Sequence, residues 1–339
     1  MVGQLHAADY VMSLHNKGIL KNRGYVPGDS QFVAIIGGAN IDIHGKSDQP
    51  LCRKDSNPGS VYTSAGGVAR NVAENLARLG VDCRLVSAVG KDHHGQTLLR
   101  LSREAGVDVQ YVQEITDAAT STYLAVLDDS GDMQVAIADM DVIDHLNAAR
   151  LKPAQAMLQQ SALMIIDSNL VGDALGWLAG SFDDKTIFAD TVSTSKAPRL
   201  KPYLSSIHTL KTSVIEVEAL TGLGAQTPRQ LLKVASYLHR QGVERVFITR
   251  GEQGVFYSTG EAKGERPPAD GKRAVQNAGG AGDAFLAGLG YAWLEDFDLD
   301  ETLQFAMTAA DITLAHAATS SPALSLAAVN RAMEAPHDA

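Results

Sequence analysis

The chain has 339 residues, a formal net charge of −10 and a hydrophobic content of 45%. This length suffices for one large α/β domain or two modest ones, and the composition excludes general disorder. A negative field repels nucleic-acid backbones and acidic membrane surfaces, so we expect neither as a main partner. The chain has only two cysteines, without metal-ligand spacing, and no apolar run of bilayer-spanning length, which favours a cytoplasmic protein.

Residues 1–30 differ from the acidic remainder of the chain. Their segment Lys17–Val26 is basic and rich in turn residues. We interpret residues 1–30 as a solvated basic arm, because charge runs are usually solvated. The alternative is a remnant of a winged-helix DNA-binding segment, although the arm is too short for a whole one.

From residue 31 to about residue 330, short apolar runs alternate with helical repeats, and we treat residues 331–339 as a C-terminal tail. The predicted strands are Phe32–Gly38, Arg84–Gly90, Leu163–Asp167, Thr186–Asp190 and Arg245–Thr249, and the first predicted helices are Ala69–Leu79 and Gln96–Ala105. Continuous apolar strands separated by helices predict a mostly parallel sheet that is covered on both faces.

Two regions contain predicted strands without helices between them. They are about residues 41–63 and 121–137, and the second alternates polar and apolar residues around the turn Asp128–Asp132. We expect these strands to form a small separate sheet, which could act as a lid or as a dimer contact.

The segment from Asn277 to Gly288 carries the most chemical information. Small residues precede Asp283, and a helix rich in Ala and Gly follows it. Backbone N–H groups at such a helix start can hold negative charge, and the carboxylate could accept a proton from a hydroxyl. Taken alone, the same pattern could equally be an N-cap after a glycine turn.

This segment resembles the C-terminal signature of the PfkB, or ribokinase-like, family of carbohydrate and nucleoside kinases. The resemblance implies that Gly280, Ala281 and Gly282 form an anion hole and that Asp283 is the catalytic base. It also implies a three-layer α/β/α fold, with a mostly parallel central sheet and a small β-sheet lid. The donor implied by the family is ATP with Mg²⁺.

A second signature lies more than two hundred residues upstream. The stretch from Ala65 to Ala73 resembles the family's N-terminal motif, and Asn40 and Asp42 match an Asn-x-Asp pair after the first strand. An Asp with two Asn side chains offers both the acceptors and the donors that sugar hydroxyls need. The substrate-binding residues implied by the resemblance are Asn40, Asp42, Gly66, Gly67 and Asn71. Asp167 and Asn169 are weaker candidates, because either could equally cap the next helix.

On the nucleotide side, the stretch Thr249–Gly254 resembles the family's turn beside ATP. The cofactor-binding residues implied by the resemblance are Thr249, Gly251, Gly254, Asn277, Gly279, Ala309 and Ala310. A plain hairpin would also explain Gly251 and Gly254, and simple helix packing would explain the two alanines. Asn277 replaces an Asp that many ribokinases use around a monovalent cation, so a K⁺ requirement is not expected.

The family's Asn-x-x-Glu motif, which organises hydrated Mg²⁺, stands here as Ser213–Glu216. Glu216 would act on the metal through water, while Ser213 replaces the usual Asn. Mg²⁺ keeps several of its waters, so one altered partner is tolerable. A weakened metal network remains an alternative.

Within the family, several stretches resemble the pseudouridine kinases, among them Asp55–Gly59 and Thr120–Leu124. The resemblance implies phosphorylation of a ribose 5′-hydroxyl, with pseudouridine as the first acceptor to consider and a homodimer as the expected assembly. The alternatives are another PfkB activity, on ribose or adenosine, and a nucleoside-sensing regulator with little turnover. A dehydrogenase is a poor match, because the first strand lacks the dinucleotide-binding glycine pattern.

Overall fold

The computed structural model describes residues 31–268, 279–316 and 319–334. Within them, a nine-stranded sheet has the order β13-β12-β11-β10-β9-β8-β1-β4-β5. Its strands are β1 (Val33–Ile36), β4 (Cys83–Gly90), β5 (Asp108–Ile115), β8 (Leu163–Asp167), β9 (Ile187–Asp190), β10 (Thr209–Ser213), β11 (Arg245–Thr249), β12 (Val255–Ser258) and β13 (Lys263–Arg266). The neighbours from β5 to β11 pair in parallel, while β12 and β13 add an antiparallel edge.

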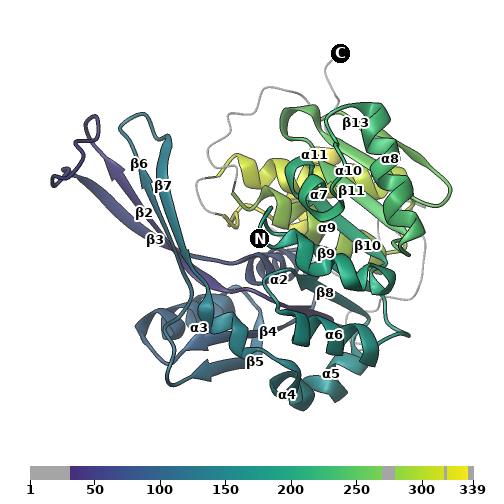
Figure 1. Ribbon diagram of the computed structural model, residues 1–339, viewed down its shortest axis with the longest axis horizontal. Coiled ribbons are helices and arrows are strands. Elements are labelled where there is room, and N and C mark those ends of the chain that lie inside the picture. Colours follow the sequence, from purple (N-terminus) through teal and green to yellow (C-terminus); the bar gives the residue numbers. More distant parts are fainter. Residues whose placement is uncertain (1–30, 269–278, 317–318, 335–339) are drawn as a thin grey trace, which may run out of the picture.

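Helices cover both faces of this sheet (Figure 1). One layer contains α2 (Val68–Arg78), α3 (His93–Glu104), α9 (Ala281–Leu294), α10 (Leu299–Leu314) and α11 (Leu326–Glu334). The opposite layer contains α4 (Ala148–Leu151), α5 (Gln155–Gln160), α6 (Gly172–Ser181), α7 (Val214–Thr221) and α8 (Pro228–Arg240). Short 3₁₀ segments, η1 (Asp141–His145), η2 (Lys152–Ala154), η3 (Ala197–Ser206) and η4 (Gly251–Gln253), lie in the connections.

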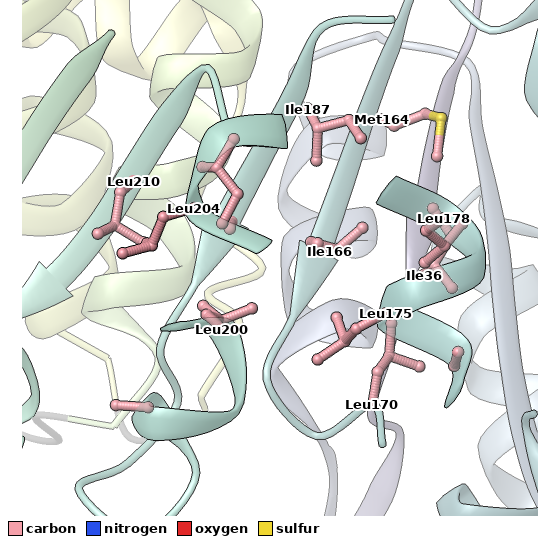
Figure 2. Close-up of a cluster of buried hydrophobic side chains, with 14 of the residues drawn as sticks. Ile36, Met164, Ile166, Leu170, Leu175, Leu178, Ile187, Leu200, Leu204 and Leu210 are labelled. Carbon is pink, nitrogen blue, oxygen red and sulfur yellow. The ribbon is translucent and has the colours of Figure 1, made fainter. Parts of the chain in front are cut away.

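The central strands are apolar along their whole length because each face meets a helical layer. In β1, Ala34 and Ile36 pack into one core, and Val33 and Ile35 pack into the other. Figure 2 shows part of the first core, where Ile36 and Ile166 from neighbouring strands meet leucines of α6. The alternation of side chains along a strand thus divides the interior into two cores.

A second sheet of four strands projects from the body of the molecule (Figure 1). Its order is β3-β2-β6-β7, with β2 at Asn40–Ser47, β3 at Gly59–Gly66, β6 at Thr122–Leu127 and β7 at Met133–Asp139. The β6–β7 hairpin turns at Gly131, whose φ of 92° lies in the left-handed region. Side chains on the outer part of β3 and β7 are exposed.

The predicted fold class is confirmed, since the large parallel sheet, its two helical layers and the separate small sheet are all present. The basic arm of residues 1–30 lies outside the described residues. Helix α11 continues to Glu334, so residues 331–334 are helical, although the sequence placed the start of a tail at residue 331. Among the described residues, every helix falls short of the length or the hydropathy that a membrane-spanning helix needs.

Candidate active site

Polar side chains gather where the central parallel strands end. Asp167 and Asp190 are the last residues of β8 and β9 and pair across the two strands, and Lys211 of β10 pairs with Asp190. The sheet extends from β1 toward β4 on one side and toward β8 on the other. The strand order therefore reverses direction at β1. In open α/β sheets, ligands bind beyond the carboxyl ends of the strands at such a reversal. We therefore place the candidate active site at this edge.

Helix α9 begins at this edge with the predicted anion hole. Gly280 caps the helix with a φ of 85°, and a Cβ there would overlap the carbonyl oxygen of Thr319, so this position favours glycine on two grounds. A Cβ on Gly282 would lie 2.5 Å from Lys211 Nζ. The N–H groups of the first helical turn and a buried ammonium group thus lie close together, which is an arrangement suited to an anion.

Asp283 lies in this first turn and is 7% exposed. Asn71 Nδ2 donates a hydrogen bond of 2.8 Å to its Oδ2. Burial and, after it, the charge of Asp190 raise the pKa of Asp283, while Lys211 and the Asn71 bond lower it; the net result is a pKa of about 7. A carboxyl group with a pKa near neutrality is suited to general-base chemistry.

Lys211 and Asp190 form a buried ion pair that the sequence analysis missed as part of the site. Lys211 Nζ lies 2.9 Å from Asp190 Oδ2, and the two residues are 7% and 1% exposed. Burial lowers the pKa of Lys211, but Asp190, Glu216 and Asp283 together outweigh burial and raise it above its ordinary value. The sequence signal that could have identified this pair is a lysine within a short buried strand, because a buried charge needs a partner of opposite charge.

The strand end after Asp190 is also strained. Val192 has a φ of 59°, which is rare for a β-branched residue, and its N–H donates to Asp190 Oδ1 at 2.6 Å. Asp190 therefore uses one oxygen for the backbone and the other for Lys211. This fixes the carboxylate beside the start of α9.

The predicted sugar-binding residues lie at the base of the small sheet. Asn40 Nδ2 donates to Asp42 Oδ1 at 2.6 Å, and both residues are buried. Asn40 pairs with Gly66 across β2 and β3, and Gly67 caps α2, which carries Asn71. Burial raises the pKa of Asp42, while Asn40, His44 and Arg70 oppose the shift. The Asn71–Asp283 bond then joins this group to the start of α9.

Asp167 and Asn169 are occupied by protein contacts. Asp167 Oδ2 accepts the N–H groups of Gly38 and Ala69 at 2.9 and 3.0 Å, and its Oδ1 accepts the N–H of Asn169 at 2.8 Å. Asn169 Oδ1 accepts a bond of 2.5 Å from Lys196 Nζ. Asp167 therefore ties the loop after β1 and the start of α2 to the end of β8.

The predicted nucleotide turn lies at the end of β11. Thr249 Oγ1 donates to the Thr212 carbonyl at 3.3 Å, and Gly251 begins η4. Gly254 has a φ of 79°, and a Cβ there would overlap the Arg266 carbonyl of β13. The Gly254 backbone thus lies close to the neighbouring strand β13, which is the arrangement expected of a hairpin.

The remaining predicted nucleotide residues lie around α9 and α10. Ala309 is 0% exposed and packs in the core between these helices, whereas Ala310 is half-buried. Gly279 lies in the exposed turn before α9, and Asn277 lies outside the described residues. Of the two alanines, only Ala310 retains surface that a ligand could contact.

Glu216 and Ser213 occupy the start of α7. Glu216 Oε2 accepts the Thr191 hydroxyl at 2.6 Å and the Ser213 N–H at 2.9 Å, and the buried Ser213 Oγ has no hydrogen-bond partner among the described residues. The described ranges contain no cluster of three or more His, Cys, Asp or Glu side chains that could hold a metal. A carboxylate and an unpaired hydroxyl fit a metal bound through its waters, as is usual for Mg²⁺.

Two helical layers cover a mostly parallel sheet, and the buried carboxylate of Asp283 lies in the first turn of α9 beside the strand ends. This combination is that of a phosphotransferase of the ribokinase type. The model for the pfkB family of carbohydrate kinases matches residues 30–326. The chain therefore belongs to this family, and it is a sugar or nucleoside kinase that transfers a phosphoryl group to a hydroxyl.

Two curated relatives from Escherichia coli K12 match most of the chain. A pseudouridine kinase is 37% identical over 303 residues, covering 89% of this chain and 96% of the relative. An uncharacterised sugar kinase, YeiI, is 34% identical over 328 residues, covering 96% of this chain and 89% of the relative. These two relatives have similar levels of identity, so the acceptor does not follow from similarity alone.

Two solved structures share the fold at lower identity. The Arabidopsis thaliana ribokinase complexed with ribose and ATP has a TM-score of 0.81 at 20% identity, covering 90% of this chain and 99% of that chain. A putative ribokinase II from E. coli with ATP and Mg²⁺ has a TM-score of 0.76 at 19% identity, covering 89% and 98%. The predicted family resemblance is thus confirmed by sequence, and the fold by structure.

Proposed function

We propose that this kinase uses ATP and Mg²⁺ to phosphorylate the ribose 5′-hydroxyl of pseudouridine. The observation that carries the proposal is the 2.8 Å bond between Asn71 and Asp283. It brings the predicted sugar-binding motif and the predicted base into direct contact, although they are 212 residues apart in sequence. The similarity to pseudouridine kinase supports this acceptor.

In the proposed reaction, Asp283 accepts the proton of the attacking hydroxyl. Asn71 holds Asp283 Oδ2, which leaves Oδ1 for that hydroxyl. The N–H groups of Gly280, Ala281 and Gly282 face the phosphoryl group as it leaves ATP, and Lys211 adds positive charge beneath them. Asn40 and Asp42 would bind the ribose hydroxyls.

Mg²⁺ would be held by the phosphates of ATP and, through water, by Glu216 and Ser213. When bound, it neutralises charge on the transferring phosphoryl group. These two protein groups would orient its waters, since the Glu216 carboxylate is fixed by the Thr191 hydroxyl and by the Ser213 N–H at the cap of α7.

The contacts of Arg70 support a neutral acceptor over a sugar phosphate. Arg70 is 4% exposed, and its guanidinium donates to the Ala65 carbonyl and to Asn71 Oδ1 and pairs with Glu74. This arginine was the basic side chain nearest the sugar motif in sequence. Because the side chain is buried and both of its Nη groups are engaged within the protein, it offers no second-phosphate site.

We further propose that a second copy of the chain covers the small sheet. Large apolar side chains are exposed on its outer strands, with Val61 at 74%, Ile137 at 62% and Val135 at 52%. The pairing registers place Val61, Val135 and Ile137 on one face. Exposed apolar patches of this kind mark interaction surfaces.

An ADP-release assay across pseudouridine, uridine, adenosine, ribose and fructose 6-phosphate tests the proposed acceptor. We expect the highest kcat/KM with pseudouridine and none above background with fructose 6-phosphate. A higher value for ribose or adenosine would replace pseudouridine with that acceptor. Nucleoside binding without turnover of any acceptor would instead support a sensor.

A further inference from the structure

The side-chain amide of Asn71 donates a hydrogen bond through its nitrogen and accepts one through its oxygen. Its Nδ2 donates to Asp283 Oδ2 at 2.8 Å, and its Oδ1 accepts a bond of 2.8 Å from Arg70 Nη1. An ionised carboxylate can only accept, and a guanidinium can only donate. The pair of neighbours therefore permits a single orientation of the amide.

Arg70 is itself held firmly. Its Nη1 also donates to the Ala65 carbonyl at 2.9 Å, and its Nη2 pairs with Glu74 one helical turn later. Glu74 is 5% exposed and also pairs with Arg78, whose Nε lies 2.9 Å from Glu74 Oε1. The Ala65 carbonyl and Glu74 thus hold the Arg70 guanidinium directly beside the Asn71 amide, while Arg78 pairs, among the described residues, only with Glu74.

We propose that Arg70 is a positioning residue: its guanidinium fixes the Asn71 amide with the N–H₂ end toward Asp283 and so sets the geometry of the base. This inference rests on the proposed role of Asp283 in phosphoryl transfer. Without Arg70, rotation of the amide would bring its oxygen toward the carboxylate. Ser320 Oγ lies 3.4 Å from Asn71 Oδ1 and would be a weaker donor to that oxygen.

Arg70 also contributes charge to both sides of the site. Its positive charge interacts favourably with Asp42 at the sugar motif and with Asp283 at the start of α9. The charged groups that shift the pKa of Asp283 most are Asp190, Lys211 and Asp167. Loss of Arg70 frees the Asn71 amide, whose bond to Asp283 lowers the pKa of that carboxyl, so Asp283 should retain its proton to higher pH.

The first test compares Arg70→Ala with Arg78→Ala. Arg78 shares Glu74 but makes no described contact with Asn71, and its side chain is 26% exposed, so it serves as the matched control. We expect Arg70→Ala to lower kcat roughly 10- to 100-fold with little change in the KM for ATP, as loss of base positioning requires. The acid limb of the kcat–pH profile should move to higher pH, whereas Arg78→Ala should leave kcat and this limb unchanged.

A double-mutant cycle with Asn71→Ala asks whether Arg70 acts through Asn71. In that background, Arg70→Ala should change kcat by less than about 3-fold, since the group it orients is already absent. Independent, multiplicative losses would overturn the proposal. Arg70→Lys retains the charge without the planar donors and should recover part of kcat; it also replaces Arg70→Ala if that variant does not fold.

Carboxyl ¹³C NMR of Asp283 supplies a measurement that does not depend on turnover. The titration midpoint of Asp283 should rise in Arg70→Ala and remain at the wild-type value in Arg78→Ala. An unchanged midpoint in Arg70→Ala would refute the positioning role, even if the wild-type protein phosphorylated none of the tested acceptors. Absence of wild-type turnover together with a raised midpoint would refute the proposed function and leave the role of Arg70 in place.

Discussion

The two sheets of this protein differ in what covers them. In the large sheet, strand residues such as Phe188 and Val246 are 1% and 0% exposed, because helices pack on both faces. In the small sheet, Val61 and Ile137 are 74% and 62% exposed. Helices of the same chain thus cover the large sheet, whereas no described residue covers the apolar face of the outer small sheet.

The small sheet itself has a buried part and an exposed part, and we expect these parts to have different roles. Its base, at Asn40 and Asp42, is buried against the large sheet and carries the predicted sugar-binding pair. Its outer part carries the exposed apolar side chains. Changes near the large sheet should therefore affect chemistry and folding, and changes on the outer strands should affect assembly.

The largest expected effect is that of Asp283→Asn. We expect kcat to fall about 10²- to 10⁴-fold, the range typical of a lost general base, with ATP affinity nearly unchanged because the backbone N–H groups remain. ADP release and calorimetric ATP binding measure the two quantities. Asp128→Asn, the same substitution in the exposed β6–β7 turn, should leave both unchanged. Wild-type-like turnover in Asp283→Asn would remove the assigned base.

Next in size is the effect of Lys211→Met. The substitution leaves Asp190 buried without its cation, and loss of one partner of a buried pair costs about 3–5 kcal/mol of unfolding free energy. Lys46→Met, at an exposed position of the small sheet, should change it by less than about 0.5 kcal/mol. Urea unfolding of the two variants measures this contrast, and similar costs would contradict it.

The pH dependence of kcat/KM for the acceptor should follow ionisation of Asp283. Because its pKa is raised to about 7, the carboxyl is protonated below that pH and cannot accept a proton. We expect kcat/KM to fall about tenfold per pH unit below the midpoint and to level off above it. A profile that stays flat between pH 5.5 and 8 would argue against a titrating base at residue 283.

The smallest effect on catalysis is expected from Ile137→Asp on the outer small sheet. A charge on this exposed apolar face should convert a dimer to a monomer in light scattering, with kcat within a few-fold of wild type. Leu232→Asp, on exposed surface of α8 in the large-sheet body, should not alter the mass. A monomeric wild-type protein, or a dimer that persists in Ile137→Asp, would exclude this face as the interface.

Much of the fold could be predicted from local sequence. The apolar runs at Leu163–Asp167 and Arg245–Thr249 coincide with β8 and β11, and the two segments predicted as strands without intervening helices form the small sheet. These patterns are local because burial on one or two faces leaves a period along the chain. The small residues before Asp283 likewise predict the start of a helix, which is α9, whereas their role as an anion hole was implied only by the family resemblance.

Tertiary packing determined which contacts the residues of these strands and helices make. Asp167 and Asp190 both end apolar strands, yet Asp167 is saturated by backbone N–H groups while Asp190 pairs with Lys211 beside Asp283. Arg70 and Ala309 acquired their surroundings in the same way, the first beside Asn71 and the second in the core between α9 and α10. Sequence determined which segments become strands and helices, because that depends on neighbouring residues. Only the folded chain determined the partner of each charge, because those partners are distant in sequence and meet through the packing of whole elements.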